Sequence, residues 1–318
     1  MKSRILLIIS SIYILLLPLC SGQSVELFNT SNSKLVDDDI QAVVVDHYGN
    51  KWLGTLKHGL IRFNDTTVTV FNKENSVIKG DCVTLLFVDS KGNLWVPFSN
   101  PESGIAMYDG NSWKVFGLND IGPIIDVRDI REVQDGSIWF AFPGKVERYK
   151  DGNWYELDIP YDNILCMDIR EDGTIAVGCD IQLLIGFNGK WKKYTEKSSE
   201  LQLGTIRGLK FSPDGSLMIG YGGGFGDGGL SILSSDRKTW THYNKSNSQI
   251  PDHTIRDIEY DGKTYWMASN NGLVTMNGTS LSAIFFREGM FKNVIHDISL
   301  EGNIVWIATN FGLIKYEP

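Results

Sequence analysis

The sequence predicts an all-β fold, a seven-bladed β-propeller of four-stranded antiparallel blades, and three observations support this prediction. Short apolar runs alternate with Gly, Asp and Asn turns along the 318-residue chain, a pattern typical of antiparallel strands. A glycine followed closely by an apolar residue recurs seven times. The chain also has one unmatched strand near its start and lacks one at its end. A single small sheet cannot bury both faces, so we expect the units to pack into a closed ring.

The repeat is clearest in residues 46–64, which contain an Asp-x-x-Gly turn, a strand around Trp52 and a second turn at Gly59. The apolar residue of each glycine–apolar pair, here called the apolar anchor, is separated from the next one by 37 to 48 residues, which is the length of a four-stranded blade. We expect the tryptophans to lie in the core between blades. The seven glycine–apolar pairs are Gly49 with Trp52, Gly92 with Trp95, Gly136 with Trp139, Gly173 with Ala176, Gly215 with Met218, Gly262 with Trp266 and Gly302 with Trp306.

Each unit shows the same order of strands. An apolar first strand is followed by an Asp/Gly turn, the strand with the apolar anchor, a Gly-bearing turn, a third strand and an aromatic-rich fourth strand. First strands are expected at 40–46, 83–89 and 255–260, third strands at 59–63 and 312–316, and fourth strands at 67–71, 112–116, 153–157, 191–194 and 239–243. The chain stops after the third strand of the seventh unit, while residues 24–29 resemble a fourth strand. We therefore expect strand 24–29 to complete the last blade.

The first 22 residues have the pattern of a signal peptide. Lys2 and Arg4 precede an apolar run at 5–19, which has the length of a signal-peptide core and is short for a membrane span. We expect cleavage before Gln23, leaving residues 23–318 as a single propeller in the periplasm or outside the cell. A lipid anchor at Cys20, as in an outer-membrane lipoprotein, stays open, although the residues before Cys20 depart from the usual lipoprotein signal. No later apolar stretch is long enough to span a membrane.

Composition and motifs exclude several classes of function. The net charge of −8 and the absence of a long Lys/Arg run argue against a nucleic-acid partner. The five histidines show no metal-ligand spacing, and no Gly-x-Ser-x-Gly nucleophile motif occurs. We therefore expect no metal, no cofactor and no recognisable catalytic constellation.

Two cysteines fall in one expected hairpin. A turn at 172–173 would pair Glu171 with Thr174 and, further out, Cys166 with Cys179. A cross-strand disulfide and a pair of buried free thiols both stay open, since an exported protein permits either.

The first and last repeats resemble a known family. The string Asn-x-x-Asn-Ser-x-Leu at 29–35, Asp39-Ile40, the 46–60 segment and Trp306-Ile-Ala-Thr with Gly312-Leu313 are similar to the two-component regulator propeller repeat. That family supplies the extracytoplasmic sensor part of hybrid two-component systems in Gram-negative bacteria. The resemblance implies extracytoplasmic recognition, with carbohydrate among the expected ligands. Family sensors carry two propellers, a β-sandwich, a membrane span and a kinase, so signalling by this single propeller would need a partner chain.

The candidate ligand site lies on the first strands, which should border a central channel. When the seven first strands are aligned on the apolar residue at their fourth position, the two positions just before that residue vary from strand to strand. The first column reads Gln41, Thr84, Arg128, Met167, Arg207, Arg256 and His296, and the second reads Ala42, Leu85, Asp129, Asp168, Gly208, Asp257 and Asp297. These charges either pair with one another in a hydrated channel, or leave arginines free to bind a carboxylate, a sulfate or sugar hydroxyls.

Loops on the same face add further candidates. The loops between second and third strands carry His58, Asn270 and Asn310, which suit carbohydrate or peptide recognition. The glycine-rich segment 221–229 is either a flexible insertion or a flap that brings Phe225 and Asp227 over the channel.

The sequence thus favours an exported, non-enzymatic binding or sensor-type propeller that recognises a glycan fragment, a peptide or a protein at the channel mouth. The alternative is a propeller lyase or hydrolase that uses His253, His296 and a nearby carboxylate. A third interpretation is a purely architectural protein.

Overall fold

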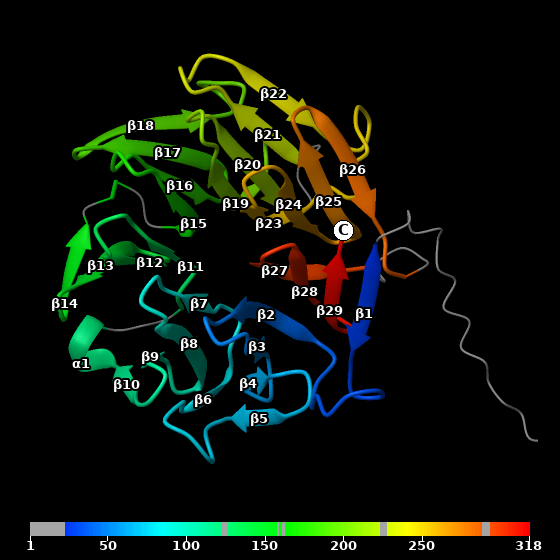
Figure 1. Ribbon diagram of the computed structural model, residues 1–318. Coiled ribbons are helices and arrows are strands. Elements are labelled where there is room, and N and C mark those ends of the chain that lie inside the picture. Colours follow the sequence, from blue (N-terminus) through cyan, green and yellow to red (C-terminus); the bar gives the residue numbers. More distant parts are fainter. Residues whose placement is uncertain (1–22, 123–125, 158, 161–162, 223–227, 288–292) are drawn as a thin grey trace, which may run out of the picture.

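The computed structural model describes residues 23–318 except 123–125, 158, 161–162, 223–227 and 288–292. Seven small antiparallel sheets stand in a ring around a central opening (Figure 1), so the predicted seven-bladed β-propeller is confirmed. The expected signal peptide and the candidate residues Phe225 and Asp227 lie outside the described residues.

The first four blades follow one another along the chain. Blade 1 consists of β2 (Ile40–Val45), β3 (Lys51–Thr55), β4 (Leu60–Phe63) and β5 (Val68–Phe71). Blade 2 consists of β6 (Gly80–Cys82), β7 (Phe87–Val88), β8 (Leu94–Pro101), β9 (Gly104–Tyr108) and β10 (Trp113–Phe116), followed by the single helical turn α1 (Leu118–Ile121). Blade 3 consists of β11 (Asp129–Glu132), β12 (Ile138–Phe142), β13 (Lys145–Lys150) and β14 (Asn153–Leu157), and blade 4 of β15 (Ile164–Ile169), β16 (Ile175–Cys179), β17 (Gln182–Phe187) and β18 (Lys190–Thr195).

Three further blades complete the ring. Blade 5 consists of β19 (Thr205–Phe211), β20 (Leu217–Gly222), β21 (Leu230–Leu233) and β22 (Trp240–Tyr243). Blade 6 consists of β23 (Ile255–Tyr260), β24 (Tyr265–Ser269), β25 (Gly272–Asn277) and β26 (Ser280–Ile284). Blade 7 consists of β27 (Ile295–Glu301), β28 (Ile304–Thr309), β29 (Gly312–Glu317) and β1 (Ser24–Phe28).

The N-terminal strand completes the last blade, as expected. β1 pairs antiparallel with β29, from Ser24 opposite Glu317 to Phe28 opposite Leu313. Figure 1 shows β1 beside the C-terminal strand at the outer edge of blade 7. The two ends of the chain are thereby joined through main-chain hydrogen bonds, which close the ring. Within the described residues, no helix has the length and apolarity required to cross a membrane.

Blade 2 departs from the expected continuous first strand at 83–89. Its inner edge is divided into β6 and β7, which both pair with β8, and residues 83–86 between them carry no strand pairing. The interruption explains why this sheet has five strands in place of four.

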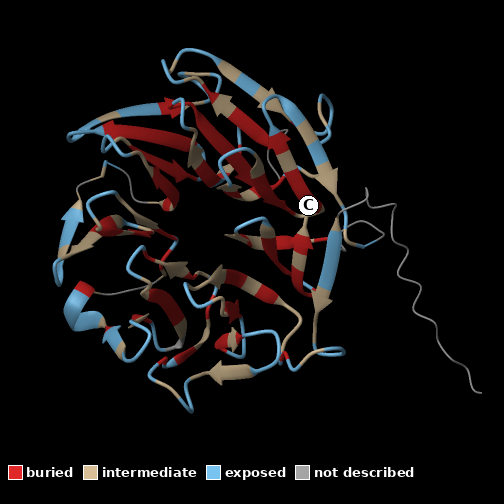
Figure 2. Ribbon diagram, in the orientation of Figure 1, coloured by how far each residue is buried: buried red, intermediate tan, exposed pale blue. Residues whose placement is uncertain are grey.

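The hydrophobic core lies between neighbouring blades. Figure 2 shows that the second and third strands of the blades are mostly buried and that the outermost strands are mostly intermediate or exposed. Trp52 of blade 1 contacts Tyr108 of blade 2, with ring centroids 5.8 Å apart, and is 1% exposed. Gly54 lets the blades approach, because a Cβ there would lie 2.4 Å from the carbonyl oxygen of Val83 in the next blade. The tryptophans therefore serve packing between blades, as predicted.

An acidic residue in the first turn of several blades accepts a hydrogen bond from the indole of the second strand. Asp89 receives the Trp95 indole N–H at 2.9 Å on one oxygen and the backbone N–H groups of Lys91 and Asn93 on the other. The same indole bond joins Asp46 to Trp52, Asp261 to Trp266 and Glu301 to Trp306. One carboxylate thus fixes both the turn and the orientation of the core tryptophan.

The Asn-x-x-Asn-Ser motif builds the loop from an outer strand to the next blade. The backbone N–H of Asn29 donates to Asn32, the Asn32 amide donates to the carbonyl of Leu27, and the Ser33 hydroxyl donates to the carbonyl of Asn29. The same bonds recur at residues 72–76 and 244–248. Folding alone accounts for this motif.

The expected pairing of Cys166 with Cys179 is wrong. Cys166 lies opposite Gly178, and a bulge shifts Cys179 to a position opposite Ile164. The hairpin register differs by one residue from the pairing that a two-residue turn would give, so the two cysteines are not cross-strand partners. Both are free and buried.

Replacing Asp89 by alanine is expected to lower the free energy of unfolding by about 2–4 kcal/mol, because the buried indole of Trp95 loses its acceptor together with the turn. Thermal and urea unfolding would measure the loss. The matched control is Asp109→Ala, which removes an exposed turn carboxylate that binds Asn111 and Ser112 but no indole. A loss at Asp89 no larger than at Asp109 would contradict the structural role of the indole bond.

Candidate functional site

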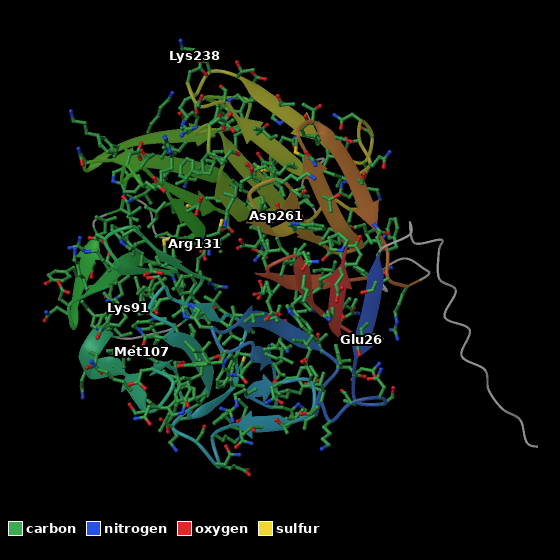
Figure 3. The ribbon with its side chains drawn as sticks, viewed as in Figure 1. Glu26, Lys91, Met107, Arg131, Lys238 and Asp261 are labelled. Atoms are coloured by element: carbon green, nitrogen blue, oxygen red, sulfur yellow. The ribbon has the colours of Figure 1, made fainter. Side chains whose placement is uncertain are left out.

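The inner strands of all seven blades surround a central channel with a cavity of about 550 Å³. Side chains reach into this opening from the surrounding sheets, and Arg131 stands at its edge (Figure 3). A second cavity of about 400 Å³ adjoins one end of the channel. The two cavities share Thr84, Leu85, Arg128, Arg207 and Arg256 as lining residues. We call this end of the channel the mouth.

β-Bulges place the mouth residues. In blades 5, 6 and 7 the pairing of the inner strand skips one residue, namely Arg207, Arg256 or His296. A bulged residue has no partner on the neighbouring strand, so its side chain need not follow the regular alternation between the two faces of the sheet. Here the three bulged basic side chains line the channel. Arg128, directly before β11, also lines both cavities. The predicted convergence of the three arginines on the channel opening is therefore observed.

The sequence alignment is shifted by two residues in blade 4, where Met167 and not Ile169 takes the position of Leu209 in blade 5. There the bulged residue is Leu165, and Cys166 follows it on the channel lining. Met167, which was expected at the mouth, is buried in the core, and Asp168 lies two positions deeper than expected, at the level of Lys210 in blade 5. Residues 164–167 include three large apolar side chains, so hydrophobicity alone could not tell Met167 from Ile169 as the core anchor.

The three mouth arginines differ in their partners. Arg128 forms an ion pair of 3.1 Å with Asp126, in which both side chains are well exposed. Arg207 is exposed and forms no hydrogen bond or ion pair with the residues that the structure describes. Arg256 donates to the Asn270 amide oxygen, and its Nε has no partner in the described part of the chain. Burial lowers the pKa of Arg256, and the neighbouring charge of Arg207 acts in the same direction.

His296 stands beside these arginines. Its Nε2 lies 3.2 Å from Asp39 and its Nδ1 lies 3.5 Å from the guanidinium of Arg256. Burial, followed by the positive charge of Arg256, lowers the pKa of His296 despite the opposing effect of Asp39. The imidazole is therefore neutral near pH 7, next to a carboxylate.

Below the mouth, carboxylates connect neighbouring blades. Asp129 accepts the backbone N–H of Met167 in blade 4 at 2.9 Å, and Asp297 accepts that of Val43 in blade 1 at 2.8 Å. Asp168, one layer deeper, accepts the N–H of Phe211 in blade 5. Two of the predicted site residues, Asp129 and Asp297, therefore hold the ring together from the channel side.

Two cations in the channel already have partners. Arg131 lies 2.7 Å from Asp129 and 3.5 Å from Asp168. Although burial disfavours its charge, these carboxylates raise the pKa of Arg131. Lys210 forms an ion pair of 3.0 Å with Glu259. The interpretation that channel charges pair with one another is therefore correct at this depth.

Asp257 is the exception among the channel carboxylates. One of its oxygens accepts the N–H of Ile258, and the other is buried without a hydrogen-bond partner in the described structure. Burial, and then the nearby charge of Glu259, raises the pKa of Asp257 to about 7. Burial and the charge of Asp257 also raise the pKa of Asp297.

The channel wall is divided into an apolar and a charged side. Blades 1 and 2 contribute mainly apolar residues, whereas blades 3 to 7 contribute nearly all the charges. The apolar side consists of Val43, Val44, Val45, Leu85, Leu86, Phe87 and Val88. A ligand in this channel would contact apolar side chains on one side and charged groups on the other.

Among the loop candidates that the structure describes, only Asn270 contacts the mouth arginines. His58 lies 2.8 Å from Asp37 and lines neither cavity. Asn310 is exposed, and its backbone N–H donates a hydrogen bond to the carbonyl of Val294. Two charged residues near the mouth were not predicted from the sequence, namely Asp39, directly before β2, and Asp126, three residues before β11. No group of three or more His, Cys, Asp or Glu side chains suited to a metal ion occurs in the described ranges.

Comparisons with known proteins support the fold. No protein-family model and no curated protein matches the sequence. An inactive variant of virginiamycin B lyase from Staphylococcus aureus, solved with quinupristin, is similar with a TM-score of 0.72 and 16% identity over 93% of this chain and 99% of that one. The extracellular domain assigned to the hybrid two-component system BT3049 of B. thetaiotaomicron gives a TM-score of 0.73 and 16% identity over 92% of this chain and 41% of that one. YCF48 bound to the D1 peptide gives a TM-score of 0.66 and 16% identity over 93% of this chain and 97% of that one. At these identities the likeness shows a shared propeller fold.

Stability should depend on the protonation of Asp257. Between about pH 4, where an unfolded aspartate ionises, and pH 7 the folded chain keeps a proton that the unfolded chain has lost. Asp257 therefore contributes stability at low pH that is lost as pH rises through this window. Melting temperatures from pH 4 to 8 should fall less with rising pH in Asp257→Asn than in the wild type. Asp151→Asn, in an exposed turn, should keep the wild-type slope, and an unchanged slope in Asp257→Asn would contradict the assignment.

Proposed function

We propose that this protein is an exported, non-enzymatic binding propeller of the two-component sensor type, which holds an anionic group of a glycan fragment, a peptide or a protein at the channel mouth. One observation carries the proposal. Three arginines converge on one cavity, and Arg207 and Arg256 have no carboxylate partner among the described residues.

The arrangement favours an anion on physical grounds. Placing like charges together is unfavourable, and the lowered pKa of Arg256 reflects both burial and the charge of Arg207. A carboxylate or sulfate would relieve both effects by accepting charge-assisted hydrogen bonds from two guanidinium groups. The cavity of about 400 Å³ is of the size that commonly accommodates a small ligand, such as one sugar or one amino-acid side chain.

Two of the structural neighbours are consistent with recognition outside the cytoplasm or with peptide binding. BT3049 contributes an extracellular domain of a two-component system, and YCF48 was solved with a peptide. The basic and apolar N-terminal segment supports export to the periplasm or the extracellular space.

Binding should depend on the mouth arginines. Arg207→Ala and Arg256→Ala are each expected to weaken the binding of uronate-containing or sulfated oligosaccharides or acidic peptides by about tenfold or more, because each removes hydrogen bonds between charged groups. Titration calorimetry with neutral and charged forms of each ligand would measure this. Arg148→Ala removes the same charge from β13, away from both cavities, and should bind like the wild type. Equal binding of neutral and charged forms, with no effect of either mouth substitution, would refute the proposal.

A lyase or hydrolase is the second candidate function, because a neutral imidazole stands 3.2 Å from a carboxylate at the mouth. A His–carboxylate pair of this kind can act in proton transfer. The fold is shared with virginiamycin B lyase. His253, the other expected histidine, lies beside the glycine-rich segment, where its carbonyl accepts the N–H of Gly229.

The enzymatic alternative predicts that His296→Ala abolishes turnover. Lyase and hydrolase assays on cyclic depsipeptides, uronate oligosaccharides and peptides would compare wild type with this variant, with Arg148→Ala as the control for general damage. Turnover that falls by a factor of about 100 or more in His296→Ala would support the alternative, in line with the usual contribution of general acid–base groups. No turnover by the wild type on any substrate, or equal turnover by both proteins, would remove it.

A further inference from the structure

Asp257 and Asp297 form a carboxyl pair on the adjacent inner strands β23 and β27, directly below the mouth. Each follows a bulged basic residue, Arg256 or His296, in the sequence. Neither carboxyl forms an ion pair with a cation among the described residues. One oxygen of Asp257 is buried and lacks a hydrogen-bond partner there as well.

The fixed cations of the channel do not satisfy this pair. Arg131 is engaged by Asp129 and Asp168, and Lys210 is engaged by Glu259. Burial, together with the charge of Glu259 near Asp257 and the charge of Asp257 near Asp297, instead raises the pKa values of these two carboxyls, so that the pair favours an extra proton. A cationic group brought by a ligand would replace that proton and occupy the unused acceptor.

Blades 1 and 2, which follow blade 7 in the ring, form the apolar side of the channel. Val44, Leu85 and Phe87 line the same cavity as the carboxyl pair, and Leu85 also lines the mouth. An apolar surface that runs from the mouth into the channel fits a hydrocarbon segment, because burying such a segment there removes apolar area from water.

The channel therefore presents arginines at its mouth and the carboxyl pair below them on blades 6 and 7. Blades 1 and 2 add an apolar surface. The Arg256 guanidinium donates to Asn270, and the Asn270 amide donates to the hydroxyl of Thr254. Thr254 precedes Asp257 by three positions, and a strand rises by about 3.3 Å per residue. The guanidinium and the carboxyl pair thus lie several ångströms apart in depth, which exceeds the separation of the two charges in an α-amino acid.

We propose that the ligand of this channel is an ω-amino carboxylate, that is, a carboxylate and a primary ammonium joined by a short methylene chain. The carboxylate binds Arg207 and Arg256, the methylenes lie on Val44, Leu85 and Phe87, and the ammonium binds Asp257 and Asp297. This inference rests on the proposed function, since it takes the mouth to be an anion site. A small ω-amino acid and the C-terminal lysine of a peptide share this chemistry.

Four probes test the inference with the full mature chain by titration calorimetry. Nα-acetyl-lysine has both charges, Nα-acetyl-norleucine lacks the ammonium, Nα-acetyl-lysine amide lacks the carboxylate, and 6-aminohexanoate lacks the peptide group. Nα-acetyl-lysine should bind about tenfold or more tightly than either singly charged analogue, because each missing charge leaves a buried group unpaired. Asp257→Asn should lower its affinity to that of the norleucine analogue, whose own binding should not change.

A control separates the carboxyl pair from the channel in general. Glu132 lines the same cavity on blade 3 but accepts both the N–H and the hydroxyl of Ser90, so Glu132→Gln should retain the preference for lysine. Binding of Nα-acetyl-lysine at pH 6 should also release a proton, seen as a dependence of the heat on the buffer, because Asp257 ionises next to the ammonium. The groups that face Asp257 and set this response are Glu259, Asp297, Arg131 and Lys210.

The outcomes distinguish the two proposals. Equal binding of Nα-acetyl-lysine and Nα-acetyl-norleucine overturns this inference and leaves the anion site at the mouth intact. Equal binding of the lysine acid and its amide, or failure of every carboxylate and sulfate to bind, overturns the anion site itself. If 6-aminohexanoate binds as tightly as Nα-acetyl-lysine, the ligand is a small ω-amino acid, whereas tight binding of Nα-acetyl-lysine alone indicates a peptide C-terminus. The wild-type comparison decides these points even where Asp257→Asn is unstable.

Discussion

The whole molecule depends on the requirement that each blade bury both of its faces against neighbours. One four-stranded sheet leaves its tryptophan side uncovered, so the blades are stable only as a ring, and the ring is closed by the pairing of β1 with β29. The Asp89–Trp95 bond and its counterparts fix the large side chains that fill the spaces between blades. Small residues such as Gly54 then let the inner strand of the next blade approach. The central channel is a geometric consequence of this packing.

Closure also explains why the channel is charged. Seven inner strands converge there, so side chains from residues far apart in the sequence face one small space. Part of this charge is structural, since Asp129, Asp168 and Asp297 accept backbone N–H groups from the following blade. Arg131 and Lys210 balance some of the carboxylates. Two arginines at the mouth and the unpartnered oxygen of Asp257, beside Asp297, are left over. Folding does not account for these groups, and a ligand would act on them.

The apolar side of the channel adds a further constraint on the ligand. Blades 1 and 2 present valine, leucine and phenylalanine where the other blades present charges. A uniformly polar molecule would leave this side poorly covered, and a uniformly apolar one would leave the arginines and carboxyls without partners. The proposed ligand, with charged ends and an apolar middle, would satisfy both sides of the channel.

The sequence by itself determined the number of blades, the strand order and the closing N-terminal strand, because these follow from a local repeat with a fixed period and from its incomplete ends. It also placed Arg128, Arg207, Arg256 and His296 at one end of the channel, since inner strands of a propeller share one orientation. Only the tertiary structure decided which of these charges are paired. Asp129 and Asp297 became bridges between blades, Met167 moved into the core, and Cys166 lost its expected partner. Register, bulges and partners across the channel arise from contacts between distant segments, and a repeat read along one chain contains no information about those contacts.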